Sequence, residues 1–210
     1  MRFVELGAVP FREAFQLQEE VLEAVAAGRA PETVHLLEHP HVFTLGRRGL
    51  EGNLLAETDF SGRPIEAIRI NRGGDITYHG PGQIVGYPHL DLRLRNRDLH
   101  KYLRSLEEAL ILTVRGYGID SFRREGLTGV WTAHGKLASI GVGVRKWITM
   151  HGFALNVSTD LRYFQLIHPC GLPDCRVVSL SSLLGRRVET EDVIPVLKAR
   201  MKEVFELSNS

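Results

Sequence analysis

The segment RGGDITYHGPGQIVGYP, residues 72–88, is the most unusual stretch of the sequence and the one from which its fold is read. Arg72 supplies a fixed cation, and the two glycines at 73–74 can take positive φ and let a ligand approach the backbone. The tyrosine and histidine at 78–79 add a polar edge, and Gly-Pro-Gly at 80–82 forces a sharp turn. The pattern indicates a binding loop, with a plain glycine-rich hairpin as the alternative. It is not a phosphate P-loop, because the lysine and the serine or threonine that end that motif are missing.

Alternating and β-branched runs on both sides of this segment predict strands. The predicted strands cover 2–6, 33–39, 42–46, 67–71, 83–92, 136–144 and 147–157. We expect the last two to form an antiparallel pair with a turn near Arg145-Lys146. The stretch 47–66, which contains several glycines and a proline, predicts an irregular loop.

Three helices are predicted. The first begins at Pro10 and ends near Gly28, because apolar residues recur there at helical spacing. The second is capped by Asp98 and carries leucines on one face, and the third begins with Thr190 as its cap. Since strands and helices are clustered rather than strictly alternating, the sequence predicts an α+β fold with a mixed β-sheet flanked by helices.

Composition restricts the class of protein. The chain has 210 residues, of which 43% are hydrophobic and 24% charged, and no linker or repeat divides it, so one domain over 1–210 is predicted. A net charge of +1 argues against a general nucleic-acid binder. No apolar run approaches the roughly 20 residues of a membrane helix, and the first residues lack the layout of a signal peptide. With only two cysteines, the chain is expected to be cytoplasmic with reduced thiols.

The segment 72–88 resembles the signature of the lipoyl(octanoyl) transferases, R-G-G-x-x-T-aromatic-H-x-x-G-Q-x-aliphatic-x-Y. The matching positions are Arg72, Gly73, Gly74, Thr77, Tyr78, His79, Gly82, Gln83, Val85 and Tyr87. Similar stretches of that family occur here as LEHPHVFTLGRR (37–48), GKLASIG (135–141), MHGFALNV (150–157) and HPCGL (168–172). Several separated motifs in the right order argue against coincidence.

The resemblance implies the fold of the biotin and lipoate protein ligase catalytic domains. It also implies a catalytic centre made of a cysteine and a lysine, with Cys170 as nucleophile and Lys136 as its partner. His79 is assigned to the catalytic group through the active-site hydrogen-bond network. The implied substrate contacts fall on Arg72, Gly73, Gly74, Asp75, Ile76, Thr77, Tyr78, His79, Ser139, Ile140, Gly141, Gly152, Phe153 and Ala154.

Local chemistry also favours Cys170 over Cys175. Cys170 lies in a proline–cysteine–glycine turn that can expose a sulfur, whereas Asp174 should raise the pKa of the Cys175 thiol. Zinc binding by the two cysteines and His168 is an alternative, but the spacing is not that of a C-x-x-C site. A structural disulfide is not expected in a reducing compartment.

Lys136, taken alone, reads as a solvated surface lysine. However, it begins the apolar run LASIGVGV (137–144), and a lysine near a thiol favours the thiolate and can carry protons once buried. Small residues at 138–144 and 152–157, together with Tyr78, are expected to wall a dry slot for an acyl chain. Because each buried methylene contributes about 0.8 kcal/mol, such a slot distinguishes eight carbons from four.

The sequence allows more than one role for the remaining basic residues and histidines. His35, His39 and His41 form a cluster for which a structural role is favoured over metal binding, because Pro40 interrupts the geometry and no carboxylate completes a ligand set. No metal and no cofactor are therefore expected. Six basic residues either form a docking face for acidic partners or are scattered solvated charges; they are Arg47, Arg48, Arg72, Arg145, Lys146 and Arg176.

The implied reaction moves an octanoyl or lipoyl group from acyl carrier protein to a lysine of a lipoyl domain, through a thioester on the cysteine. The implied acceptors are the lipoyl domains of 2-oxoacid dehydrogenase E2 subunits and the glycine cleavage H protein, with neither nucleic acid nor membrane as a partner. Two alternatives remain: an ATP-dependent lipoate–protein ligase, and a non-catalytic module that binds lipoyl domains.

Overall fold

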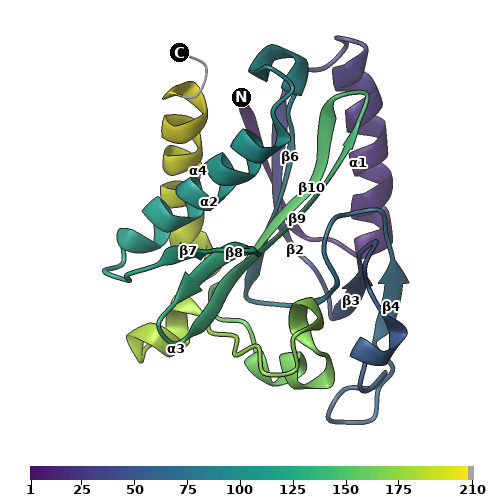
Figure 1. Cartoon of the computed structure of the whole chain (residues 1–210), viewed down its shortest axis with the longest axis vertical. Helices are drawn as coiled ribbons and strands as arrows, with labels where there is room; N and C mark the ends of the chain where they lie inside the picture. The colour runs from purple at the N-terminus through teal and green to yellow at the C-terminus, as the bar shows by residue number, and fades with distance from the viewer. Residues whose placement is uncertain (208–210) are drawn as a thin grey trace.

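The computed structural model describes residues 1–207, so the last three residues of the predicted domain over 1–210 lie outside the described part. Most strands belong to one large sheet (Figure 1). In spatial order its strands are β1 (Arg2–Ala8), β2 (Thr33–Glu38), β6 (Gln83–His89), β10 (Ile148–Asn156), β9 (Gly135–Arg145), β8 (Leu127–Thr132) and β7 (Phe122–Arg124). Only β1 and β2 pair in parallel, and the other neighbours are antiparallel. The predicted mixed sheet is confirmed.

A second, smaller sheet contains β4 (Glu66–Arg69), β3 (Val42–Leu45) and β5 (Ile76–His79). The central strand β3 is parallel to β4 and antiparallel to β5. Strand β5 lies inside the 72–88 segment and was not predicted, because the glycines around it dominated the local signal. Strands β7 and β8 were also missed.

Helices cover both faces of the large sheet. α1 (Phe11–Ala26) packs on one face against β6 and β10, while α2 (Leu99–Arg115) and α4 (Thr190–Leu207) pack together on the other (Figure 1). Asp98 caps α2 as predicted, since its side chain accepts a hydrogen bond from the backbone N–H of Lys101. Thr190 is instead the first residue of α4, and its hydroxyl donates to Glu38.

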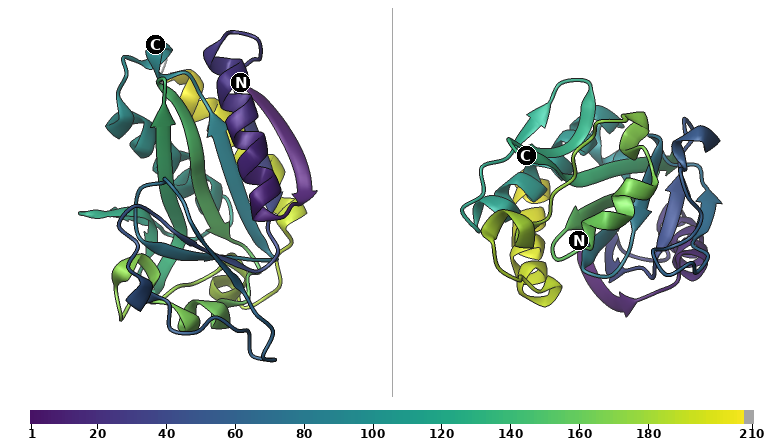
Figure 2. Two further views of the ribbon diagram at one scale, coloured as in Figure 1. Left: turned by 90° about the vertical axis from the view of Figure 1, so that its right-hand side faces the viewer. Right: turned by 90° about the horizontal axis from the view of Figure 1, so that it is seen from below.

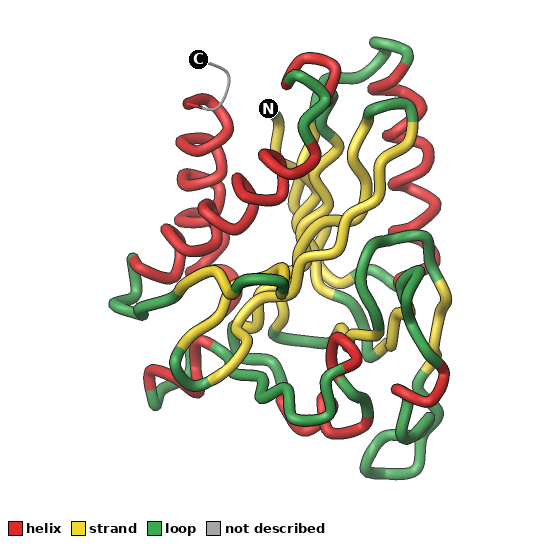
Figure 3. The backbone as a smooth tube through the Cα atoms, viewed as in Figure 1, coloured by secondary structure: helices red, strands yellow, loops and turns green. Residues whose placement is uncertain are grey.

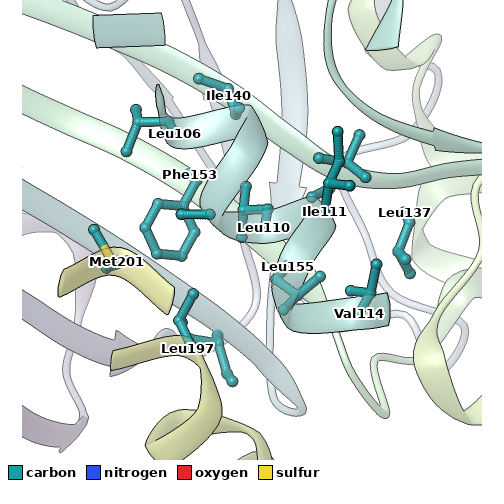
Figure 4. Close-up of a cluster of buried hydrophobic side chains, with 14 of the residues drawn as sticks. Leu106, Leu110, Ile111, Val114, Leu137, Ile140, Phe153, Leu155, Leu197 and Met201 are labelled. Atoms are coloured by element: carbon teal, nitrogen blue, oxygen red, sulfur yellow. The ribbon is translucent and has the colours of Figure 1, made fainter. Parts of the chain in front are cut away.

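The main core lies between the large sheet and the α2–α4 pair. Leucines at helical spacing on α2, among them Leu106 and Leu110, meet Phe153 and Leu155 of β10 (Figure 4). Leu197 and Met201 of α4 close the cluster from the other side. This packing follows from period 3.6 on the helices and period 2 on the strands, which place apolar side chains on facing surfaces.

Loops and short helices gather at one end of the large sheet (Figure 2, right; Figure 3). They include the 3-10 helices η1 (Glu51–Asn53), η3 (Leu161–Leu166) and η4 (Pro169–Gly171), followed by the short helix α3 (Leu180–Leu184); η2 (Leu92–Arg95) lies elsewhere, before α2. A second apolar cluster holds part of this end to the small sheet, and in it the rings of Tyr78 and Tyr163 stack 4.9 Å apart. Across residues 1–207, no helix combines the length and the apolar character needed to cross a membrane.

Candidate active site

A cavity of about 320 Å³ opens between the 72–79 segment and strands β9 and β10. Its size falls at the lower end of the range typical for small-molecule sites, roughly 300–1,000 Å³. Apolar side chains from three elements contribute to its wall, among them Phe11 of α1, Val85 of β6 and Phe153 of β10. Charged and polar side chains also line it, among them Arg72, Lys136 and Cys170, so the wall is part apolar and part polar.

Lys136 and Cys170, which are 34 residues apart in sequence, meet in this cavity. The Lys136 Nζ lies 2.9 Å from the Cys170 Sγ, within hydrogen-bond reach. Lys136 is only 4% exposed, while Cys170 is half-buried. An ammonium at this distance from a sulfur favours the thiolate, which is the nucleophilic form of cysteine.

Three neighbours hold Lys136 in place. Its backbone N–H donates to the carbonyl of Arg176, and its carbonyl accepts from Val178, so β9 is clamped to the segment that follows the cysteine turn. Its Nζ lies 5.2 Å from the centre of the Trp131 ring, a favourable position for a cation over an aromatic face. Gly129 (φ 133°) provides the space, because a Cβ there would lie 2.8 Å from the Lys136 Cε.

Cys170 lies in a tight turn with backbone φ 61°, a left-handed conformation that is rare for residues other than glycine. Such conformations persist where surrounding contacts enforce them and are concentrated at functional sites. The next residue is glycine for lack of space, because a Cβ on Gly171 would lie 2.7 Å from Asp75 Oδ2, which accepts from Asn53. The N–H of Gly171 already donates to the carbonyl of His168, so it does not point freely at a reacting group.

Arg72 is a second buried cation of the cavity. Its guanidinium is 8% exposed and donates to the carbonyls of Gly73 and Thr44 and to the Thr44 hydroxyl. Burial lowers the pKa of Arg72 to about 10, while a negative charge on Cys170 opposes that shift. The group therefore stays protonated near neutral pH, and its charge and that of a Cys170 thiolate stabilise one another.

The structure places His79 at the cavity within a buried hydrogen-bond network. Both ring nitrogens are bonded within the protein, Nδ1 to Gln83 Oε1 at 2.8 Å and Nε2 to Thr44 Oγ1 at 3.3 Å. Burial lowers the pKa of His79 to about 3, so the ring is neutral near pH 7. Both ring nitrogens therefore have partners within the protein, and a role of His79 through this network stays a prediction.

Most of the residues expected to contact substrate line the cavity. These are Arg72, Gly73, Gly74, Asp75, Ile76, Thr77, His79, Ser139, Ile140, Gly141, Gly152, Phe153 and Ala154. Tyr78 does not: its ring is fully buried in the second apolar cluster, and its hydroxyl bonds to Nδ1 of His41. The expectation that Tyr78 walls the acyl slot is wrong, because alternation along β5 turns it away from Thr77 and His79.

Several cavity residues were not assigned a role from the sequence. Phe11, Val85, Tyr87 and His151 line the wall, and His151 Nε2 lies 2.8 Å from Asn71 Oδ1. Burial lowers the pKa of His151 to about 3, which makes it a neutral wall residue. Val85 and Tyr87 carried a usable signal, since they alternate along one strand within the 72–88 segment.

The open readings of the other polar residues are partly resolved. The pKa of the Cys175 thiol is raised as predicted, but chiefly by burial and then by Cys170, not by the neighbouring aspartate. His39 has a structural role, bonding the carbonyl of Val9 and the Tyr87 hydroxyl. The six basic residues do not form one face: Arg72 is buried, and Arg145 and Lys146 pair with glutamates of α1 at the far end of β9.

Comparison with known proteins shows which family the chain resembles. Residues 10–202 match the family model of the lipoyl protein ligase A/B catalytic domain. The chain is 54% identical over 206 residues to an octanoyltransferase of Syntrophotalea carbinolica, covering 98% of this chain and 93% of the relative. The chain belongs to the octanoyltransferase family. An octanoyltransferase of Geobacter sulfurreducens is 57% identical over 188 residues, covering 90% of this chain and 77% of that relative.

Solved structures show the same fold at low sequence identity. A bipartite lipoate protein ligase from Thermoplasma acidophilum superposes with a TM-score of 0.71 at 19% identity, covering 98% of this chain and 83% of that one. A biotin protein ligase from Aquifex aeolicus superposes with a TM-score of 0.60 at 13% identity, covering 98% and 70%. The predicted likeness to the biotin and lipoate ligase fold is confirmed.

Proposed function

We propose that the chain transfers an octanoyl group from a carrier-protein thioester to a lysine of a lipoyl domain through a thioester on Cys170. The observation that carries this proposal is the 2.9 Å contact between Lys136 Nζ and Cys170 Sγ inside a cavity whose wall is partly apolar. The names of the relatives, which are octanoyltransferases, supply the acyl group. Protein lipoylation begins with this transfer.

In the first half-reaction, the Cys170 thiolate attacks the carbonyl carbon of the incoming thioester. A new carbon–sulfur bond to Cys170 forms, and the bond to the carrier sulfur breaks. The departing thiolate takes a proton from the Lys136 ammonium and leaves as a thiol. The enzyme is then an octanoyl thioester on Cys170 beside a neutral lysine.

In the second half-reaction, the acceptor lysine arrives as an ammonium and gives one proton to Lys136, which acts as general base. The free amine attacks the acyl carbon, the second proton leaves to solvent, and Cys170 departs as a thiolate. The product is an amide, and the ammonium–thiolate pair is restored. Because a thioester is converted to an amide, the transfer runs downhill without ATP.

The surroundings support these steps. The cavity wall is apolar enough for a fatty chain, and Arg72 supplies a second positive charge toward the sulfur. Proposed donors and acceptors are octanoyl-acyl carrier protein and the lipoyl domains of 2-oxoacid dehydrogenase E2 subunits and the glycine cleavage H protein. The proposed setting is the cytoplasm, where a free thiol at Cys170 persists.

The test compares the same substitution, cysteine to serine, at positions 170 and 175. Wild-type chain and the Cys175→Ser variant, mixed with octanoyl-acyl carrier protein, are expected to gain one octanoyl group that hydroxylamine removes, measured by intact-protein mass spectrometry. Cys170→Ser is expected to gain none. If Cys175→Ser is the inactive variant, the assignment of the nucleophile is wrong.

A further arm separates the proposal from the two alternatives. Free octanoate with ATP is expected to leave a lipoyl domain unmodified in the presence of this chain, whereas a ligase would acylate it. A purely binding protein would acquire no covalent octanoyl mass under any of these conditions.

A further inference from the structure

A continuous line of hydrogen bonds runs through the protein behind the cavity, beginning at Arg72. The guanidinium donates through Nη2 to the Thr44 carbonyl at 2.6 Å and to the Thr44 hydroxyl at 3.0 Å, and through Nη1 to the Gly73 carbonyl. Within residues 1–207 no ion pair with a carboxylate holds this guanidinium, so oxygens of Thr44 provide two of its three hydrogen bonds. Thr44 is fully buried on β3 and does not line the cavity.

The far end of this line fixes the orientation of its amides. Asn156 Nδ2 donates to the carbonyl of Val178, so Asn156 Oδ1 faces Gln83 and accepts from its Nε2 at 2.9 Å. The same Gln83 nitrogen donates to the carbonyl of Tyr78, which leaves Gln83 Oε1 as an acceptor. The Nδ1 of His79, 2.8 Å away, must therefore carry the ring proton.

This proton arrangement determines the direction of the Thr44 hydroxyl. With its proton on Nδ1, His79 presents Nε2 as an acceptor, and the only polar hydrogen directed at it in the described structure is that of the Thr44 hydroxyl, 3.3 Å away. The hydroxyl thus donates to His79 and keeps its lone pairs for Arg72. Every donor from the guanidinium to Asn156 points the same way, an arrangement in which successive hydrogen bonds polarise and strengthen one another.

The line joins the two cations that flank the nucleophile. It passes from Asn156 to the Val178 carbonyl, and the Val178 N–H donates to the carbonyl of Lys136. Arg72 stands at one end and the backbone of Lys136 at the other. Displacing any buried member leaves polar groups unpaired, so the line holds the Arg72 guanidinium and the backbone of Lys136 in one arrangement.

We propose that Thr44 is a positioning residue, which orients the Arg72 guanidinium so that its charge stabilises the Cys170 thiolate. The charged and titratable side chains that line the same cavity as this sulfur are Arg47, Arg48, Arg72, Asp75, His79, Tyr87, Lys136 and His151, and a charge on Cys170 also acts on the Cys175 thiol. Thr44 touches neither the sulfur nor the cavity and acts only through Arg72. This inference rests on Cys170 being the nucleophile of the proposed function.

The test measures alkylation of Cys170 by iodoacetamide against pH, in a Cys175→Ser background so that one thiol reports. In Thr44→Val, which removes the hydroxyl but keeps the Thr44 carbonyl as a partner of Arg72, the pH of half-maximal alkylation is expected to rise by about 0.5–1 unit. This is less than the roughly 1–2 units that correspond to a whole hydrogen bond to a charged group. Thr44→Ser, which keeps the hydroxyl, is expected to restore the wild-type midpoint. Thr113→Val is the matched control, because Thr113 is a buried threonine of α2 whose hydroxyl bonds Ala109.

A double-mutant cycle shows whether the effect passes through Arg72. In an Arg72→Gln background, Thr44→Val is expected to cause no further shift. A wild-type midpoint for Thr44→Val, an equal shift in Thr113→Val, or an undiminished shift without Arg72 would each overturn the proposal. If Thr44→Val does not fold, a wild-type midpoint for Thr44→Ala leads to the same rejection.

The alkylation readout needs no acyl donor, which separates this inference from the proposed function. If the alkylation midpoint shifts in Thr44→Val but the wild-type chain gains no octanoyl group, the role of Thr44 stands and the proposed acyl transfer is rejected. If the wild-type chain forms the acyl-enzyme but the midpoint does not shift in Thr44→Val, the acyl transfer stands and the role of Thr44 is rejected.

Discussion

At the scale of single residues, the chemistry depends on how Lys136 is packed. Trp131 lies beneath its ammonium, Gly129 leaves room for its stem, and Cys170 receives its hydrogen bond. A lysine ammonium on a residue that is only 4% exposed is costly unless a counter-charge is close. A thiolate on Cys170 would supply that counter-charge, and it is the form of the sulfur that the proposed mechanism uses.

Lys136→Ala is expected to slow both half-reactions by about 10²–10⁴-fold, because the residue donates a proton in the first and accepts one in the second. Rapid-quench measurement of acyl-enzyme formation and of its decay on a lipoyl domain resolves the two rates. Lys202→Ala on α4, where the lysine is exposed, is the control and should match wild type. Rates unaffected by Lys136→Ala would exclude the lysine from the mechanism.

At the scale of elements, α2 connects the sheet to α4 and thereby supports the strands that carry the site. Its fully buried Leu110 lies among Phe153, Leu155 and Leu197 (Figure 4). β10 receives this packing on one face while its residues 152–154 line the cavity, so the shape of the slot depends on the core behind it.

Leu110→Ala is expected to lower the free energy of unfolding by about 2–5 kcal/mol through the cavity it leaves. Urea denaturation followed by circular dichroism measures this change. Leu94→Ala in η2 is the control, since Leu94 is 74% exposed and its truncation should alter stability by no more than about 0.5 kcal/mol. Equal stability of the two variants would show that α2 is not a principal support of the sheet.

At the scale of the whole molecule, the fold buries neutral imidazoles on and around the large sheet. Burial lowers the pKa of four histidines, two of them to about 4 and two to about 3: His39, His89, His79 and His151. Aromatic rings of α1 pack against two of them: Phe11 contacts His39, and Phe15 contacts His151. The folded state therefore binds fewer protons in mild acid than the unfolded chain does.

This difference makes stability depend on pH. Above the unfolded pKa of about 6.5 each of these histidines is neutral in both states and costs no stability. As pH falls toward the folded pKa, only the unfolded chain binds the proton, and each histidine lowers stability by about 1.4 kcal/mol per pH unit. We expect the free energy of unfolding to fall steeply between pH 6.5 and about pH 4, as measured by urea denaturation at several pH values.

The matched variants for this prediction are His89→Gln and His134→Gln. The first removes a buried histidine and should flatten the dependence by about 1.4 kcal/mol per pH unit near pH 5. The second removes an exposed one and should leave the dependence as it was. A slope unaltered by His89→Gln would show that this histidine does not couple protonation to folding.

The sequence alone was sufficient for much of the fold and for the family to which the chain belongs. β-branched runs and helical spacing predicted the long strands and the three long helices, because those patterns report directly which face of an element is buried. Separated motifs around Arg72, Lys136 and Cys170 indicated the family and the residue types of the site. The strands β5, β7 and β8 were not predicted, because they are short and lie beside glycines or turns.

Only the tertiary structure decided which side chains meet. The contact of Lys136 with Cys170 joins β9 to a turn 34 residues later, and local sequence cannot measure such a distance. Nor does the local pattern show that Tyr78 points away from the cavity, or that His79 is already bonded to Thr44 and Gln83. His79 on β5 meets Thr44 on β3 and Gln83 on β6, so its hydrogen bonds depend on three strands from two sheets converging. Hydrogen bonds form between neighbours in space, which the order of residues along the chain does not specify.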